Sequence, residues 1–323
     1  MRSWFACAIV GLVSSAIGSA ALADQDFPQR EITFIVPWNA GGSNDVLARG
    51  LQPLLRERGI NIVIENITGA TGANGLRRVA GAAPDGYTLG MGTSSTLAVM
   101  VQKKVPLKND QFTNIARVST EPLMLLVPTS SPYQSLDQFI EHMKKTPGGV
   151  TIGTPGSYNL NHIFASMTAR AAGVAYTNVP YTGGSQVVAD LLGQHVEAGV
   201  LKPSETIGVI QQGSLKPIGV FADERLEMLP DVPTFKEKGF DVFPYGPVAQ
   251  MAYVVGPANL PPDIRARLIH AFRTAIQDPR FKEFAQKNVF LVDDMTGDAL
   301  NKEIGDVSAS IDAVATKVFP RTE

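Results

Sequence analysis

A repeated pattern constrains this chain most strongly: a short apolar segment, then a glycine-bearing loop, then an amphipathic helix. The first copy runs from the apolar segment 32–36 through the loop 37–43 into the helical pattern of 44–58. Apolar residues recur there at helical spacing, although Pro53 predicts a kink or a later helix start. Because parallel strands need crossover connections, such units predict parallel sheets that are covered by helices.

The chain contains two sets of these units, and its 323 residues are many for a single core. A last strand at 252–255 is expected to return to the first set. The first domain would then comprise 24–123 and 247–323, and the second 124–246. We therefore expect an α/β fold of two domains, each a mostly parallel sheet flanked by helices. The remaining strands are expected at 61–65, 87–91, 123–127, 150–154, 177–180 and 197–200.

Capping residues predict where three helices begin. Ser135 and Gln138 have the spacing of a capping box, in which a hydroxyl accepts a hydrogen bond from the first turn. Ser185 is expected to cap a second helix. The run Pro261-Pro262-Asp263 indicates a third, because proline is tolerated in the first helical turn.

The first 23 residues are typical of a cleaved export signal. Arg2 gives a positive start, Phe5–Leu22 carries no charge, and Ala21-Leu22-Ala23 forms a small-residue cleavage motif. Cleavage before Asp24 would release the protein into the periplasm. A membrane anchor is the alternative. We do not expect one, because the segment is short and contains Gly and Ser, whereas a spanning helix needs about 20 predominantly apolar residues.

Composition argues against several function classes. The formal net charge is −2 and basic residues do not cluster, so no nucleic-acid surface is expected. The single cysteine, Cys7, lies in the export signal, which leaves no thiol for disulfides, catalysis or metal binding. The four histidines lack ligand spacing, and we expect neither a metal nor a cofactor. Common hydrolase and phosphate-loop motifs are absent, so no catalytic residue is expected.

Three loops are candidate binding elements because each follows a strand and precedes a helix. Ligands of open α/β sheets bind at the carboxyl ends of strands. Free backbone N–H groups and the helix dipole favour an anion there. An ordinary helix start or polar turn is the alternative for each loop. The loops are 37–45, 153–162 and 181–185, and 92–96 is a candidate fourth wall.

Segments around these loops resemble the Bug family, the extracytoplasmic binding proteins of tripartite tricarboxylate transporters. The matching segments follow one another over nearly the whole chain after residue 23. The resemblance implies a two-lobed periplasmic-binding-protein fold (Venus flytrap, type II-like) with a discontinuous first domain. The segments are REITFIVPWNAGGSND at 30–45, ENITGATGANG at 65–75, AAPDGYTLGMGTSS at 82–95, VPYTGGSQVVADLLGQHVE at 179–197 and LPDVPTF at 229–235.

The resemblance also implies a site in which backbone amides and hydroxyls hold a carboxylate. Family members often carry Asp where this chain has Leu201, and two aromatic residues before Gly where it has Met251-Ala252-Tyr253. Lys202 is a candidate counter-charge for a second carboxylate, with a solvated surface lysine as the alternative. The expected ligand-binding residues are Trp38, Asn39, Ala40, Gly41, Gly42, Ser43, Asp45, Thr93, Ser94, Thr154, Gly156, Ser157, Tyr158, Asn159, Asn161, Tyr181, Thr182, Gly183 and Lys202.

Together these features predict a periplasmic solute-binding protein that captures a small carboxylate, with a di- or tricarboxylate favoured. We expect a monomer that delivers this ligand to the membrane permease subunits of a tripartite tricarboxylate transporter. One alternative is a protein that presents its ligand to a sensor kinase. The other is an exported hydrolase.

Overall fold

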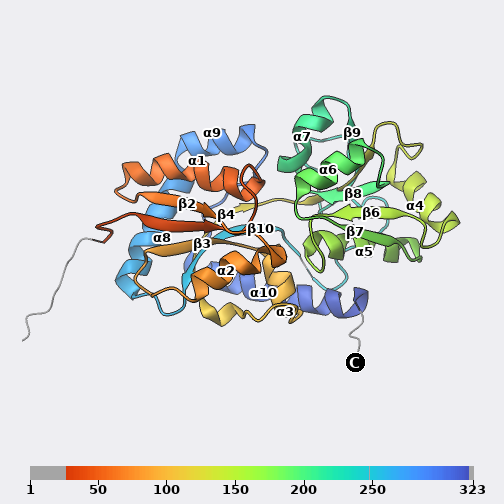
Figure 1. Cartoon of the computed structure of the whole chain (residues 1–323). Coiled ribbons are helices and arrows are strands. Elements are labelled where there is room, and N and C mark those ends of the chain that lie inside the picture. The colour runs from red at the N-terminus through yellow and green to blue at the C-terminus, as the bar shows by residue number, and fades with distance from the viewer. Residues whose placement is uncertain (1–26, 247, 320–323) are drawn as a thin grey trace, which may run out of the picture.

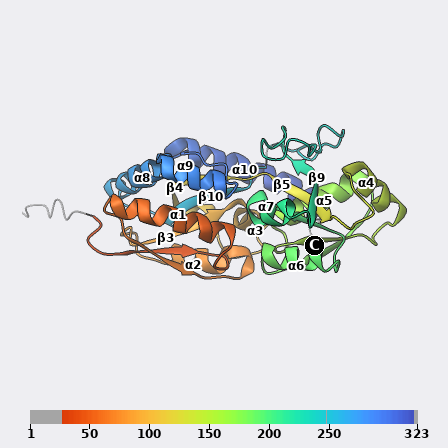
Figure 2. The same ribbon diagram turned by 90° about the horizontal axis from the view of Figure 1, so that it is seen from above.

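The protein forms two sheets of five strands that lie side by side, each flanked by helices (Figures 1 and 2). The computed structural model describes residues 27–246 and 248–319, so the predicted export signal lies outside the described residues. We call each sheet with its helices a lobe. The predicted α/β fold with two flanked sheets is confirmed.

The first lobe is built from both ends of the described chain. Its strands are β1 (Ile32–Val36), β2 (Ile62–Asn66), β3 (Thr88–Thr93), β4 (Phe112–Thr120) and β10 (Met251–Pro257), in the order β2-β1-β3-β10-β4. Its helices are α1 (Ser43–Glu57), α2 (Ala73–Ala80), α3 (Ser94–Val101), α8 (Pro262–Gln277), α9 (Pro279–Lys287) and α10 (Gly297–Val318), with short 3-10 turns at Ala70–Gly72 and Asn109–Gln111.

The second lobe is formed by the continuous middle of the chain. Its strands are β5 (Leu123–Pro128), β6 (Thr151–Thr154), β7 (Thr177–Pro180), β8 (Ala198–Leu201) and β9 (Leu215–Phe221), in the order β7-β6-β8-β5-β9. Its helices are α4 (Leu136–Lys145), α5 (Leu160–Ala172), α6 (Gly184–Leu192) and α7 (Pro203–Gln211).

Both sheets are mixed, with two parallel and two antiparallel pairings each. In the first lobe β1 runs parallel to β2 and β3, whereas β10 is antiparallel to β3 and β4. In the second lobe β6 runs parallel to β7 and β8, whereas β5 is antiparallel to β8 and β9. The antiparallel strands β5 and β10 are the first strands after the chain crosses from one lobe to the other. Because no crossover helix links either of them to an earlier strand of its own sheet, neither needs to run parallel to its neighbours.

Two chain crossings and one helix connect the lobes. Glu121 and Pro122 link β4 directly to β5, and the chain returns between β9 and β10. The Glu121 N–H donates a 2.9 Å hydrogen bond to the carbonyl of Gln250, which joins the two crossings. Helix α10 runs beneath both lobes, and Phe319 just beyond it packs on Tyr158, with 5.2 Å between ring centroids (Figure 1).

Two predicted helix starts are wrong in detail. Helix α1 begins at Ser43 after an N-cap at Gly42 and continues through Pro53, so the later start is not seen. Helix α6 begins at Gly184 after Gly183, which places Ser185 in the first turn instead of at the cap. In contrast, the starts of α4 and α8 are confirmed.

We expect His162 to make the stability of the fold depend on pH. Burial lowers the pKa of its imidazole to about 4, and Nδ1 accepts a 3.0 Å hydrogen bond from the Tyr158 N–H. This pKa lies below the value of about 6.5 for an unfolded histidine. The neutral imidazole of His162 therefore makes its full contribution to the free energy of unfolding above pH 6.5. That contribution is lost as the pH falls from about 6.5 through 4.

Urea unfolding of the wild type and of His162→Asn measures this effect, since asparagine keeps an acceptor but does not titrate. Between pH 7 and pH 4 the free energy of unfolding should fall by about 2–3 kcal/mol more in the wild type than in the variant. Parallel pH profiles of the two proteins would contradict this role of His162.

Candidate ligand-binding site

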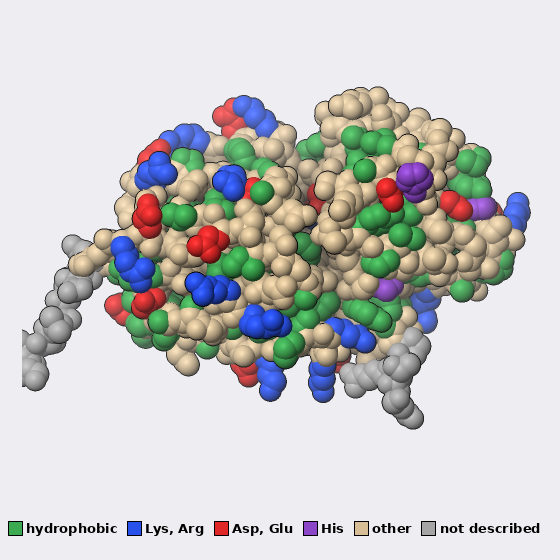
Figure 3. All heavy atoms as spheres, viewed as in Figure 1, with side chains coloured by type: hydrophobic (Ala, Val, Ile, Leu, Met, Phe, Trp, Pro, Cys, Tyr) green, Lys and Arg blue, Asp and Glu red, His purple; other side chains and the backbone are tan. Residues whose placement is uncertain are grey.

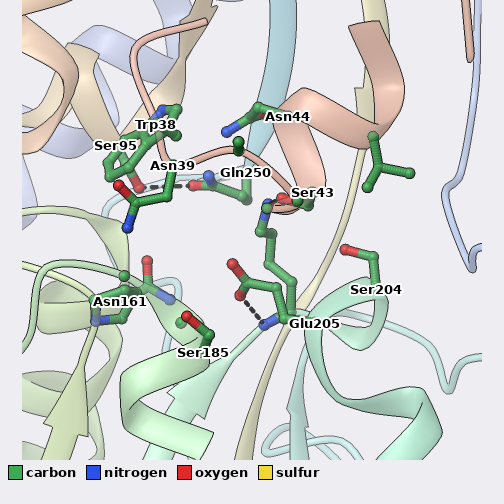
Figure 4. Close-up of a pocket in the computed structure, with 18 of the residues that line it drawn as sticks. Trp38, Asn39, Ser43, Asn44, Ser95, Asn161, Ser185, Ser204, Glu205 and Gln250 are labelled. Carbon is green, nitrogen blue, oxygen red and sulfur yellow. Dashed lines mark hydrogen bonds between the residues drawn. The ribbon is translucent and has the colours of Figure 1, made fainter. Parts of the chain in front are cut away.

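A cavity of about 290 Å³ lies between the lobes (Figure 4). Small-molecule sites commonly measure about 300–1,000 Å³, so this volume fits a small ligand. The second lobe and the first lobe both line it, together with Gln250 from the returning crossing. The other lining residues are Trp38, Asn39, Ala40, Gly41, Gly42, Ser43, Asn44, Val46, Ser95, Pro155, Asn159, Asn161, Thr182, Gly183, Gly184, Ser185, Lys202, Ser204, Glu205, Asn288 and Phe290.

Five helices begin at this cavity. Helices α1 and α3 follow β1 and β3 in the first lobe, and α5, α6 and α7 follow β6, β7 and β8 in the second. Residues in or next to the first turn of each helix line the cavity. Because a helix N-terminus carries about half a positive charge and unpaired N–H groups, the arrangement suits an anion.

Two of these N-termini, one from each lobe, have a glycine at the N-cap. In the described part of the chain no side-chain cap closes α1 at Gly42 or α6 at Gly183. By contrast, the side chains of Thr93 and Asn159 accept hydrogen bonds from the first turns of α3 and α5. The first N–H groups of α1 and α6 are therefore available to a ligand between the lobes.

Asp45 holds the first loop from behind. Its carboxylate accepts hydrogen bonds of 2.8–3.0 Å from the Gly41 N–H and from the side chains of Arg49 and Asn66. The amide of Asn66 also donates to the Trp38 carbonyl at 3.0 Å. Burial alone would raise the pKa of Asp45, but these hydrogen bonds outweigh burial and the pKa is lowered. The ionised carboxylate thus fixes the loop that leads into α1.

Lys202 reaches across the cavity from the second lobe to the first. Its ammonium contacts the Ser43 hydroxyl at the start of α1 and lies 3.5 Å from a carboxyl oxygen of Glu121. Lys202 is only 7% exposed, so it is not a solvated surface lysine. An ammonium beside the positive end of α1 is unfavourable by itself, and an anion placed between them would relieve this repulsion.

Glu121 lies behind Lys202 at the direct crossing between the lobes and is 4% exposed. Burial raises the pKa of its carboxyl group, and the charge of Lys202 opposes that rise. The Ser204 N–H in the first turn of α7 donates to the same carboxyl at 3.4 Å. A buried ion pair therefore connects the crossing, the cavity and the start of α7.

The structure brings many of the predicted residues together. Those from the first loop reach the cavity from one side, and those from the loops before α5, α6 and α7 reach it from the other (Figure 4). Whether each contacts the ligand stays a prediction. The predicted residues that line the cavity are Trp38, Asn39, Ala40, Gly41, Gly42, Ser43, Asn159, Asn161, Thr182, Gly183 and Lys202.

Three predicted residues of the first lobe lie behind the cavity wall. Besides Asp45, these are Thr93, which caps α3, and Ser94, whose hydroxyl accepts a 3.0 Å hydrogen bond from the Met251 N–H. Both are fully buried. Their neighbour Ser95 lines the cavity instead and donates to the side chain of Gln250 at 3.2 Å.

Several predicted residues of the second lobe lie outside the cavity lining. All of them except Ser157 make contacts within the protein. Thr154 donates a 2.8 Å hydrogen bond to the carbonyl of Gly156 and so braces the loop before α5. Tyr158 packs against Phe319, and its carbonyl accepts from Gln102 of the first lobe at 2.7 Å. The Tyr181 hydroxyl donates to Asp190 at 2.7 Å. The idea that Tyr158 covers the ligand is not supported by this geometry.

Sequence reasoning missed further lining residues. Ser204 and Glu205 lie in the first turn of α7, where the strand-end rule applied to β8 could have found them. Gln250, Asn288 and Phe290 come from distant segments without a local signal. Val46 follows the first predicted loop. The remaining lining residues lie within the predicted loops without having been singled out, and they are Asn44, Ser95, Pro155, Gly184 and Ser185.

Comparison with known proteins identifies the family. The sequence model of TctC, described as the tripartite tricarboxylate transporter family receptor, matches residues 47–318. The chain belongs to the TctC family. Protein BugT of Bordetella pertussis is 30% identical over 276 residues, which cover 84% of this chain and 84% of BugT.

Solved structures agree with the TctC assignment. Periplasmic binding protein BugD is 26% identical, with a TM-score of 0.82 over 90% of this chain and 98% of that chain. MatC from Rhodopseudomonas palustris, solved with bound malate, is 25% identical, with a TM-score of 0.77 over 90% of this chain and 98% of that chain. The predicted periplasmic-binding-protein fold is thereby confirmed.

TctC proteins are solute-binding receptors and not enzymes, as the sequence predicts for this chain. Among residues 27–246 and 248–319, no helix has the length and apolar character needed to cross a membrane. The same residues contain no group of three or more His, Cys, Asp or Glu side chains that could hold a metal ion. On the face shown in Figure 3, acidic and basic side chains are interspersed.

Proposed function

We propose that this protein is exported to the periplasm, captures a small carboxylate between its lobes and delivers it to the permease subunits of a tripartite tricarboxylate transporter. The observation that carries the proposal is the cavity between two uncapped helix N-termini, α1 of one lobe and α6 of the other. An anion is the ligand that such N-termini favour. Membership of the TctC family, described as receptors of tripartite tricarboxylate transporters, supports such a transporter as the partner.

The proposed binding mode places the ligand carboxylate at the N-terminus of α1, facing Lys202 and α6 of the second lobe. Such a carboxylate completes its contacts only when both lobes surround it. Its differential contacts then favour the closed form over the open one. We propose that the lobes that move comprise residues 24–123 with 247–323, and 124–246, and that they rotate about the joined crossings at Glu121 and Gln250.

Polar side chains on both walls of the cavity support a polar ligand. Figure 4 shows Asn39 on one wall and Asn161 and Ser185 on the other, which supply amides and a hydroxyl.

These groups are sufficient for useful affinity. Micromolar binding requires about 8 kcal/mol. Hydrogen bonds to a charged group contribute roughly 1.5–3 kcal/mol each, so three or four of them supply much of that free energy. MatC, which resembles this chain in sequence and fold, was solved with malate, a small acid. The preference for di- or tricarboxylates that the sequence suggests depends on Lys202 being available as the counter-charge.

A thermal-unfolding screen of small organic acids tests the proposed function. The matching acid should raise the midpoint by several degrees, because a ligand at 1,000 times its Kd stabilises the folded state by about 4 kcal/mol. Calorimetry should then give one site per chain. The derivative in which every carboxylate of that acid is converted to a methyl ester or amide is the control and should bind at least tenfold more weakly. Equal binding of the uncharged control, or turnover of the ester, would contradict the proposal.

Uptake of the labelled acid tests delivery. A strain that lacks the protein should lose uptake, and the plasmid-borne gene should restore it. Normal uptake with loss of an acid-induced transcriptional response would instead indicate presentation to a sensor kinase.

A further inference from the structure

The cavity contains a carboxylate of the protein itself. Glu205, in the first turn of α7, lines the cavity, and its carboxylate lies against Gly184, the first residue of α6. A β-carbon at Gly184 would lie 2.8 Å from both Cδ and Oε1 of Glu205. Figure 4 shows the Glu205 carboxylate on the same wall as Ser185 and directed towards the cavity. A negative charge of the protein is thus fixed next to the N-terminus of α6.

The charges around the cavity do not favour a second acid group at that end. Among the described residues that line it, the charged side chains are Lys202 and Glu205. Lys202 also contacts Glu121, 3.5 Å away. The ammonium thus has a carboxyl partner within the protein before any ligand binds, and Glu205 adds a second negative charge to the cavity wall. Two carboxylates that share a site repel each other, so a ligand carboxylate beside Glu205 would be unfavourable.

The two ends of the cavity differ in chemistry. At the α1 end an uncapped N-terminus and the ammonium of Lys202 meet at Ser43, which favours a carboxylate. At the α6 end Glu205 is an acceptor without a side-chain donor among the described residues, and it accepts a 3.3 Å hydrogen bond from the Lys202 N–H. An acceptor of this kind favours a hydrogen-bond donor on the ligand.

We propose that Glu205 makes the site selective for small acids that carry one carboxylate and, at the other end, a hydrogen-bond donor such as an ammonium or amide group. This selectivity rests on the proposed function, because it assumes that the acid end of the ligand binds at α1 and Lys202. It replaces the preference for di- or tricarboxylates that Lys202 alone suggests. Glu205 then determines which carboxylates the receptor accepts.

The charge of Glu205 can be separated from its structural role. Its oxygen accepts the Lys202 N–H and so helps to start α7, a role that a glutamine oxygen also fulfils. Glu205→Gln therefore keeps the shape and the cap but removes the charge. Glu227→Gln, at an exposed position of the same lobe, removes one charge outside the cavity lining and is the matched control.

The test uses sets of acids of equal length: succinate, succinamate and 4-aminobutanoate, and glutarate, glutaramate and 5-aminopentanoate. Calorimetry should show that the wild type binds the best amide or amino acid of a set at least tenfold more tightly than the dicarboxylate. In Glu205→Gln the ratio of the dicarboxylate Kd to the Kd of that amide or amino acid should fall at least tenfold. In Glu227→Gln this ratio should equal that of the wild type. Thermal unfolding without ligand verifies that both variants are folded.

Two results would overturn the proposal in distinguishable ways. A wild type that prefers the dicarboxylates, or a ratio that is the same in Glu205→Gln, would overturn the selectivity and leave carboxylate capture standing. If neither these six acids nor any acid of the thermal-unfolding screen bound to the wild type, carboxylate capture itself would be contradicted, and the selectivity with it. The wild-type comparison is decisive even without the variant.

Discussion

Replacing Ser43 with Asp will abolish ligand binding while the fold stays at least as stable as the wild type. Ser43 is the first residue of α1, and its N-cap, Gly42, has no side chain to accept hydrogen bonds. A carboxylate at an uncapped N-terminus stabilises a helix by about 0.3–1 kcal/mol. The same carboxylate would pair with Lys202 and occupy the place of the ligand's acid group. We expect the affinity to fall at least 100-fold by calorimetry.

Ser43→Asn is the matched control, because asparagine has the size of aspartate without its charge. It should weaken binding no more than about tenfold, which corresponds to roughly one lost hydrogen bond. Urea unfolding should rank Ser43→Asp as equal to or more stable than Ser43→Asn. Similar affinities of the two variants would show that the acid group of the ligand binds elsewhere.

Lys202→Met is expected to destabilise the protein by about 3–5 kcal/mol, in addition to weakening ligand binding. The substitution removes the ammonium that lies 3.5 Å from Glu121 and leaves that buried carboxyl group without a counter-charge. Removal of one partner of a buried ion pair commonly costs this much, whereas replacement of both partners by apolar or neutral groups is often nearly neutral. Urea unfolding at pH 7 measures the cost.

Two comparisons separate the loss of charge from the loss of packing. The double variant Lys202→Met/Glu121→Gln should recover most of the lost stability. Burial raises the pKa of Glu121. A carboxyl group with a raised folded-state pKa contributes its stability below the unfolded value of about 4.3 and loses it as the pH rises through the folded-state pKa. Lys202→Met should therefore lower the free energy of unfolding less at pH 4 than at pH 7. A cost that neither acidification nor the second substitution reduces would contradict the buried pair.

Much of the fold could be predicted from the sequence because its signals are local. An apolar strand such as β1, a glycine loop and an amphipathic helix such as α1 are each specified within a few residues. The direction of β5 and β10 is not local, since it depends on how the chain crosses between lobes. Two strands were missed. Phe112–Thr120 of β4 mixes apolar and polar residues without regular alternation, and Leu215–Phe221 of β9 contains Pro217 and Gly219, which disfavour a strand.

The candidate site could be predicted to the level of loops but not of side chains. The strand-end rule places the loop before α1 at the edge of the first sheet and those before α5 and α6 at the edge of the second, and the family resemblance implies that the two edges face each other. It does not say that Asp45 faces backwards or that Tyr158, with φ of 60°, turns towards Phe319. Those orientations follow from tertiary contacts. The partnership of Lys202 with Glu121 likewise joins residues that lie far apart in the sequence.

The most direct test is the structure of the protein in complex with the acid that gives the largest thermal shift. The ligand carboxylate should lie about 3 Å from the backbone nitrogen of Ser43 or Asn44 in the first lobe. At the same time it should contact Lys202 in the second lobe. A carboxylate that is held by one lobe alone, or that binds outside the cavity between the lobes, would contradict the account.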